Sequence, residues 1–135
     1  MQYTIQEIEG IGPTYGSKLA QAGITNTRQL LDQCGGAKGR REVAARTGLD
    51  ESQLLKWANM ADLMRISGIG KQFAELLEAA GVDTVKELRN RNGVNLTAKM
   101  KEVNAAKKLT RGTPSMQQVS AWIDQAKMLP PAISH

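Results

Sequence analysis

The second half of the chain repeats the first at a fixed offset of 58 residues. The segment from Ile8, IEGIGPTYGSKLAQAGITNTRQL, aligns without a gap with the segment from Ile66, ISGIGKQFAELLEAAGVDTVKEL. The offset then grows to 65, which pairs Trp57 with Trp122 and implies an insertion of about seven residues between Val94 and Pro114. A repeat of this kind predicts two similar supersecondary units that bury their apolar faces together.

The repeat also divides the chain into parts. We predict a first unit over residues 1–64, a second over residues 65–129, and a flexible tail over residues 130–135, because Pro130 and Pro131 cannot continue a helix. With 135 residues, the two units together have the size of one ordinary domain.

The composition favours an all-α fold. Aromatic residues make up only 4% of the chain, whereas Ala, Leu, Lys, Gln and Glu, which are good helix formers, are abundant. Helix breakers and caps then predict helices over residues 13–22, 25–31, 40–46, 51–64 and 83–89, and one that starts at Lys71. Gly35, Gly36 and Gly39 predict a mobile link before the third of these.

Each unit places a Gly-Ile-Gly sequence where two helices meet. Glycine adopts backbone angles that other residues avoid, so the chain can reverse tightly while the isoleucine stays in the core. The turn then exposes amide hydrogens at the positive end of the next helix. Such a group of donors fits a phosphate oxygen.

The spacing of these residues resembles the helix-hairpin-helix signature, in Gly68, Ile69, Gly70, Ala74 and Leu77 and again in Gly10, Ile11, Gly12, Gly16 and Leu19. The hairpins are similar to those of repair DNA polymerases and of the C-terminal domain of the bacterial RNA polymerase α subunit. The tandem unit with its Trp-bearing helix resembles a bacterial family known mainly as a domain of unknown function.

The resemblance implies contact with the DNA backbone without sequence specificity, sometimes with a monovalent cation held by turn carbonyls. DNA is the first candidate partner and RNA the second. Many such hairpins only pack helices or contact protein, so the alternative function is a protein-interaction adaptor or a structural scaffold.

The two hairpins differ in charge. Arg65, Ser67 and Lys71 surround the second, whereas Glu7 and Glu9 precede the first and Pro13 removes one of its amide hydrogens. We therefore predict that the second hairpin is the working surface and that the first is mainly structural, with Gly10, Ile11, Gly12 and Thr14 as secondary contacts.

The basic side chains are also unevenly distributed. The net charge is +5, and residues 65–135 hold eleven basic and six acidic side chains. The predicted nucleic-acid contacts are Arg65, Ser67, Gly68, Ile69, Gly70 and Lys71, with electrostatic support from Lys99, Lys101, Lys107, Lys108 and Arg111.

The segment from Val43 to Leu55 also has helix-turn-helix spacing. Its reading helix would open with Asp50 and Glu51, which DNA would repel, so we favour a degenerate hairpin there. Trp57 and Trp122 have apolar neighbours at helical intervals, which predicts packing inside the core and argues against base stacking.

The sequence offers little for catalysis. His135 is the only histidine, Cys34 the only cysteine, and the acids form no familiar metal or acid–base motif, so we expect no enzymatic activity and no metal. No apolar run approaches the roughly 20 residues that a membrane span needs, and the N-terminus lacks a secretion signal, so we expect a cytoplasmic protein without a membrane partner.

Overall fold

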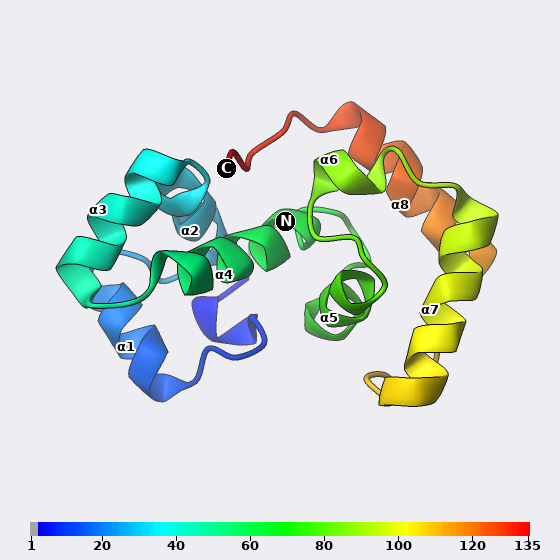
Figure 1. Ribbon diagram of the computed structural model, residues 1–135, viewed down its shortest axis with the longest axis horizontal. Coiled ribbons are helices and arrows are strands. Elements are labelled where there is room, and N and C mark those ends of the chain that lie inside the picture. The colour runs from blue at the N-terminus through cyan, green and yellow to red at the C-terminus, as the bar shows by residue number, and fades with distance from the viewer. Residues whose placement is uncertain (1–2) are drawn as a thin grey trace.

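The computed structural model describes residues 3–135 (Figure 1). Within that range the fold contains eight α-helices, and its only β pairing is a single bridge between Thr4 and Asn26. This confirms the all-α prediction. The elements are η1 (Ile5–Glu7), α1 (Pro13–Gln21), α2 (Thr27–Cys34), α3 (Ala37–Thr47), α4 (Glu51–Leu63), α5 (Lys71–Ala79), α6 (Val85–Leu88), α7 (Gly93–Lys107) and α8 (Met116–Met128). None of these helices is both long and apolar enough to cross a membrane.

Capping side chains set where the helices begin. Pro13 is the first residue of α1, where its missing amide hydrogen costs nothing. Asn26 accepts a hydrogen bond from the amide of Gln29, and Thr84 at the same repeat position accepts one from Glu87. For this reason α2 and α6 each begin two residues later than the sequence predicts.

The two halves of the chain pack their helices in the same pattern. In the first half α2 lies against α4, α1 against α3, and α3 against α4; in the second half α6 lies against α8, α5 against α7, and α7 against α8. The α4–α5 contact joins the two halves, which lie side by side in Figure 1.

A tryptophan on the last helix of each half packs under the Gly-Ile-Gly turn of the same half. The rings of Trp57 and Tyr15 have centroids 5.2 Å apart, and those of Trp122 and Phe73 are 5.4 Å apart. The two indoles are only 2% and 3% exposed, which confirms the predicted core role. At the turn itself, a Cβ on Gly68 would lie 3.0 Å from Nε1 of Trp122.

The insertion in the second half lengthens α7 and the loop after it. The helix has 15 residues, whereas its counterpart α3 has 11. Lys108 then ends α7 in the left-handed conformation, with φ 53°. The side chain of Asn104 orders the loop, because it donates to the carbonyl of Thr110 and accepts from the Thr110 amide. We call residues 107–112 the basic prong, after Lys107, Lys108 and Arg111.

The glycine-rich link between α2 and α3 is more structured than the sequence predicts. Gly39 lies inside α3, so only Gly35 and Gly36 connect the two helices. A Cβ on Gly39 would collide with the carbonyl oxygen of Gln33. The glycine therefore allows α3 to approach the end of α2, and the prediction of a mobile link is wrong at this position.

The tail of residues 130–135 is non-helical, as its prolines predict, and hydrogen bonds connect its backbone to the rest of the protein. The amide of Ser134 donates to the carbonyl of Gly35 at 2.8 Å, which ties the tail to the first half. Arginine side chains bind its carbonyls: Arg89 binds Leu129, Arg65 binds Pro130, and Arg40 binds Ser134. Charged donors make these the stronger kind of hydrogen bond.

Arg40 is the buried anchor of this tail. Its side chain donates to the carbonyls of Cys34, Gly35 and Ser134, and the residue is 5% exposed. We expect Arg40→Met to lower the free energy of unfolding by about 3 kcal/mol, because buried carbonyls lose a charged donor. Arg41→Met, at the exposed neighbouring position, should change it by less than about 0.5 kcal/mol. Urea unfolding of both variants tests this, and equal losses would contradict the anchoring role.

Candidate nucleic-acid interface

The two Gly-Ile-Gly turns have the same backbone geometry. Gly10 and Gly68 have φ of +90° and +95°, which an L side chain rarely adopts. In each turn the amide of the isoleucine donates to a carbonyl three residues earlier at 3.1 Å, from Ile11 to Ile8 and from Ile69 to Ile66. The next glycine, Gly12 or Gly70, is the N-cap of α1 or α5 and supplies no capping side chain.

This geometry decides which amides are available to a ligand. The amide of Ile69 closes the turn, so it cannot contact phosphate as the sequence suggested, and the same holds for Ile11. The amides of Gly68, Gly70 and Lys71 donate to no acceptor within residues 3–135. Together with the first turn of α5, they form the cluster of donors that the sequence predicts at a helix start.

An ion pair brings the two turns together. Nζ of Lys71, the first residue of α5, lies 3.3 Å from a carboxylate oxygen of Glu9, which precedes Gly10. Both side chains are 46% exposed. Glu9 therefore does not only weaken the first hairpin for anions. It also neutralises the main cation of the second.

Ser67 is held in place through its backbone. Its amide donates to the side-chain oxygen of Gln125 on α8 at 3.1 Å, and its carbonyl lies 3.5 Å from the amide nitrogen of the same side chain. The hydroxyl of Ser67 makes no hydrogen bond within the described residues, so it is available as a donor.

Arg65 faces away from the turn. Its Nε donates to Asp62 at 2.9 Å, and Nη2 lies 2.6 Å from the same carboxylate oxygen. Asp62 is 1% exposed and also accepts from the amide of Val85, so its buried charge needs this arginine. Because Asp62 and the tail hold this guanidinium away from the turn, we remove Arg65 from the expected phosphate contacts at the turn.

The basic run of the second half does not form one continuous surface. Lys99 and Lys101 are two positions apart on α7, so their side chains point roughly 160° apart. Lys99 also lies 3.9 Å from Glu102. The basic prong lies at the C-terminal end of α7 and in the loop that follows. Its lysines and arginine are exposed and make no ion pair within residues 3–135.

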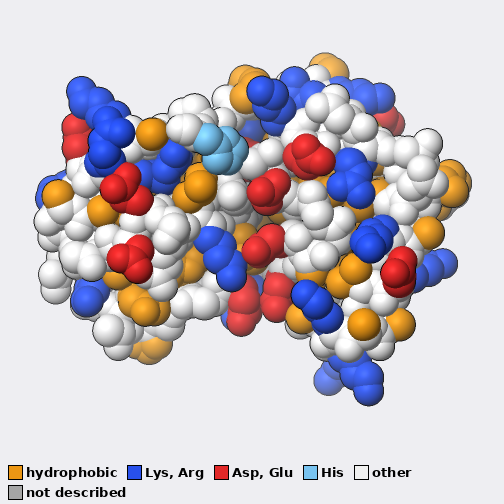
Figure 2. Space-filling view, viewed as in Figure 1, with side chains coloured by type: hydrophobic (Ala, Val, Ile, Leu, Met, Phe, Trp, Pro, Cys, Tyr) orange, Lys and Arg blue, Asp and Glu red, His pale blue; other side chains and the backbone are white. Residues whose placement is uncertain are grey.

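Acidic side chains lie between the second turn and the basic prong. Glu75 and Glu78 of α5 line a hollow with Lys107. Figure 2 shows acidic groups gathered near the middle of the face of the molecule that is in view. Burial, with Glu9 and Glu78 nearby, raises the pKa of Glu75 above its ordinary value, although Lys71 and Lys56 oppose the shift. The carboxylates interrupt the positive potential here.

The helix-turn-helix interpretation of residues 43–55 has charge against it. The helix that would enter a DNA groove is α4, which is buried from Trp57 to Leu63 and exposes Glu51 in its first turn. The first turn of such a helix contacts base edges, and DNA repels a carboxylate there.

The ion pair between Glu9 and Lys71 and the contact between Gln125 and Ser67 were not foreseen from the sequence. Each joins residues that are 58 or more positions apart. The offset of 58 relates equivalent residues of the two units, but it carries no signal for how one unit lies against the other.

Comparison with protein families gives a match over residues 9–129 to the model described as Domain of unknown function (DUF4332). The chain belongs to this family. No curated protein and no solved structure matches it. The matched residues of this DUF4332 chain include both Gly-Ile-Gly turns and all of α1 to α8, and therefore the α4–α5 contact between the two halves.

Glu75 offers a test of the electrostatics in this DUF4332 chain. Its raised pKa means that ionisation costs the folded state stability. The folded protein therefore has its full stability below the ordinary carboxyl pKa, where Glu75 is protonated. It loses part of that stability as the pH rises through the raised pKa of Glu75 in the folded state. Glu75→Gln should therefore raise Tm at pH 7 and leave it unchanged near pH 4.

Thermal unfolding followed by circular dichroism at the two pH values measures this difference. Glu42→Gln on α3 is the matched control, because Glu42 is exposed and makes no ion pair within the described range. A Glu75→Gln variant that is no more stable than wild type at pH 7 would contradict the electrostatic account.

Proposed function

We propose that this protein binds nucleic acid, with DNA as the first candidate, through backbone phosphates and without sequence specificity. The observation that carries the proposal is the distance of 3.3 Å between Lys71 and Glu9, because two turns with available amides then lie near each other. The likeness of both turns to helix-hairpin-helix motifs supports the same function.

The second turn supplies the main contacts in this proposal. The amides of Gly68, Gly70 and Lys71 would donate to phosphate oxygens, with the ammonium group of Lys71 and the hydroxyl of Ser67 at the sides. The positive end of the α5 dipole adds to their attraction. Phosphate contacts carry no base information, so affinity should depend strongly on salt and weakly on sequence.

The first turn serves as a second contact. The amides of Gly12 and Thr14 make no hydrogen bond within the described residues, and Thr14 is exposed. Glu9 acts here as a competitor that an incoming phosphate displaces from Lys71. An exposed ion pair is worth about 0–1 kcal/mol, so this displacement costs little.

The basic prong provides long-range attraction. Lys107, Lys108 and Arg111 are exposed beside α5, and Lys107 lines a hollow with Glu75 and Glu78. Because Lys99 and Lys101 face different directions, only one of them can help any single bound duplex. The basic prong would therefore increase the rate at which nucleic acid associates and the salt dependence of that rate. It would contribute less to the orientation of the bound nucleic acid.

A monovalent cation is compatible with the turns. The carbonyl oxygens of Gly10 and Gly68 accept no hydrogen bond from the described residues, so these carbonyls are the ones that would hold it. A bound cation would supply positive charge next to the phosphate.

The alternative function, a protein-interaction adaptor, has one observation in its favour. Glu75 and Glu78 make no ion pair within residues 3–135 and lie together on α5. A basic protein surface would suit these carboxylates, whereas a nucleic acid would be repelled by them.

Fluorescence anisotropy with labelled duplex, junction, single-stranded DNA and RNA over a salt series tests the proposal. We expect Lys71→Glu to weaken binding by about tenfold at about 50 mM salt and to reduce the salt slope. Glu9→Gln should tighten binding by about threefold, because it frees Lys71. Lys38→Glu, an equal charge change at an exposed position on α3, controls for net charge.

Absence of binding by wild type at about 50 mM salt would overturn the nucleic-acid proposal and favour the adaptor. Equal losses in the Lys71→Glu and Lys38→Glu variants would mean that any surface charge serves, which contradicts a site at the turns.

A further inference from the structure

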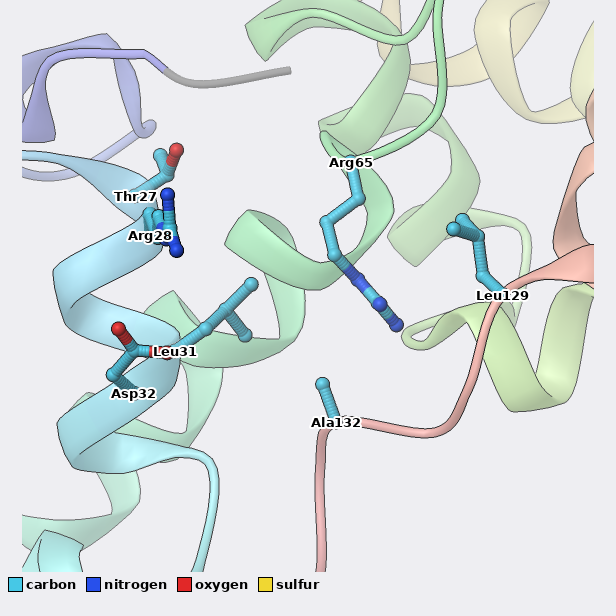
Figure 3. Close-up of a pocket in the computed structure, with 7 residues that line it drawn as sticks. All are labelled: Thr27, Arg28, Leu31, Asp32, Arg65, Leu129 and Ala132. Carbon is cyan, nitrogen blue, oxygen red and sulfur yellow. The ribbon is translucent and has the colours of Figure 1, made fainter.

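A cavity of about 420 Å³ lies where the two halves meet, on a different part of the molecule from the pair of turns. Its walls come from α2, from Arg65 after α4, and from the tail (Figure 3). The volume falls within the range of small-molecule sites, which are mainly apolar and carry a few polar groups. The apolar part consists of Leu31, Leu129 and Ala132.

Arg65 presents a fixed edge of positive charge to this cavity. Asp62 holds Nε and Nη2, and the carbonyl of Pro130 accepts from Nη2, so the guanidinium cannot swing away. Nη1 makes no hydrogen bond within the described residues. Figure 3 shows the guanidinium of Arg65 and the side chain of Leu31 entering the cavity from opposite sides.

A second cation lies on the α2 wall. Arg28 is exposed and makes no ion pair within residues 3–135, and Asp32 follows it one turn along the helix. Figure 3 shows Arg28 on the α2 wall, apart from the guanidinium of Arg65 on the opposite wall. An anionic group would therefore bind the free Nη1 edge of Arg65, across the cavity from Asp32, and Arg28 would add positive charge at longer range. The rest of the ligand would lie along Leu31 and the tail.

We infer that this cavity binds a small amphipathic anion, with a carboxylate or phosphate head at Arg65 and an apolar body against Leu31, Leu129 and Ala132. The site goes beyond the proposed nucleic-acid binding and uses none of its amides. Because the ligand would touch α2, the α4–α5 link and the tail together, its binding would stabilise the joint between the two halves.

Isothermal titration calorimetry of the full chain with four probes tests this site. Hexanoate and hexyl phosphate carry both the head and the body, hexanol lacks the charge, and inorganic phosphate lacks the body. We expect at least one of the two amphipathic anions to bind about tenfold or more tightly than hexanol and inorganic phosphate. Which of the two binds better identifies the head group.

Three variants locate the binding. Arg28→Ala, at an exposed position that leaves the fold intact, should weaken binding of the preferred anion by about threefold, because it removes a positive charge from the opposite wall. Ala132→Leu should weaken binding by about tenfold, because the larger side chain takes space that the apolar body needs, and Arg41→Ala on α3 should leave it unchanged. Equal affinity for hexanol and the anions, no binding of either anion, or unchanged affinity in both cavity variants would each overturn the inference.

Discussion

The packing of an indole beneath a left-handed glycine is the constraint on which the rest of the structure depends. Gly68 must lack a side chain both for its backbone angle and because a Cβ would lie 3.0 Å from Nε1 of Trp122. Gly10 has the same left-handed angle, and a Cβ there would be in ordinary contact with Trp57, at 3.6 Å from Nε1. The tryptophan thereby ties the last helix of each half to the first turn of that half. The rings of Tyr15 on α1 and Phe73 on α5 pack against the same tryptophans, so this contact helps to set the positions of the two helices.

In the proposed function, the joint between the halves brings two turns to one nucleic-acid backbone. A single turn with a few available amides would be a weak anion site, whereas two neighbouring turns would contact phosphates of the same backbone. The α4–α5 contact holds the halves together, and the pair of Glu9 and Lys71 spans the two turns and masks a cation. Both side chains are 46% exposed, so solvent screens the ion pair and makes it weak. In the proposed function, a phosphate would therefore replace Glu9 as the partner of Lys71.

Local signals predicted the bounds of α1 to α4 and α6 to within three residues and the start of α5, because breakers and caps such as Pro13, Asn26 and Thr84 act over a few residues. They gave no bounds for α7 and α8. Interactions across the chain were beyond them. Arg65 stands beside the turn in sequence, yet the buried carboxylate of Asp62 holds it on the other side. The Asp62–Arg65 spacing of three, typical of a helical ion pair, was the available sign. The anchored tail had no such local signal, because its partners belong to three separate elements.

The most direct measurement of the central claim is a ¹H–¹⁵N NMR titration of the protein with a short DNA duplex, read amide by amide. The account predicts that the largest shifts occur together at the amides of both turns, at Gly68 and Gly70 and at Gly12, because both lie on one surface. Shifts confined to the basic prong, or to one turn alone, would contradict a composite phosphate-binding surface.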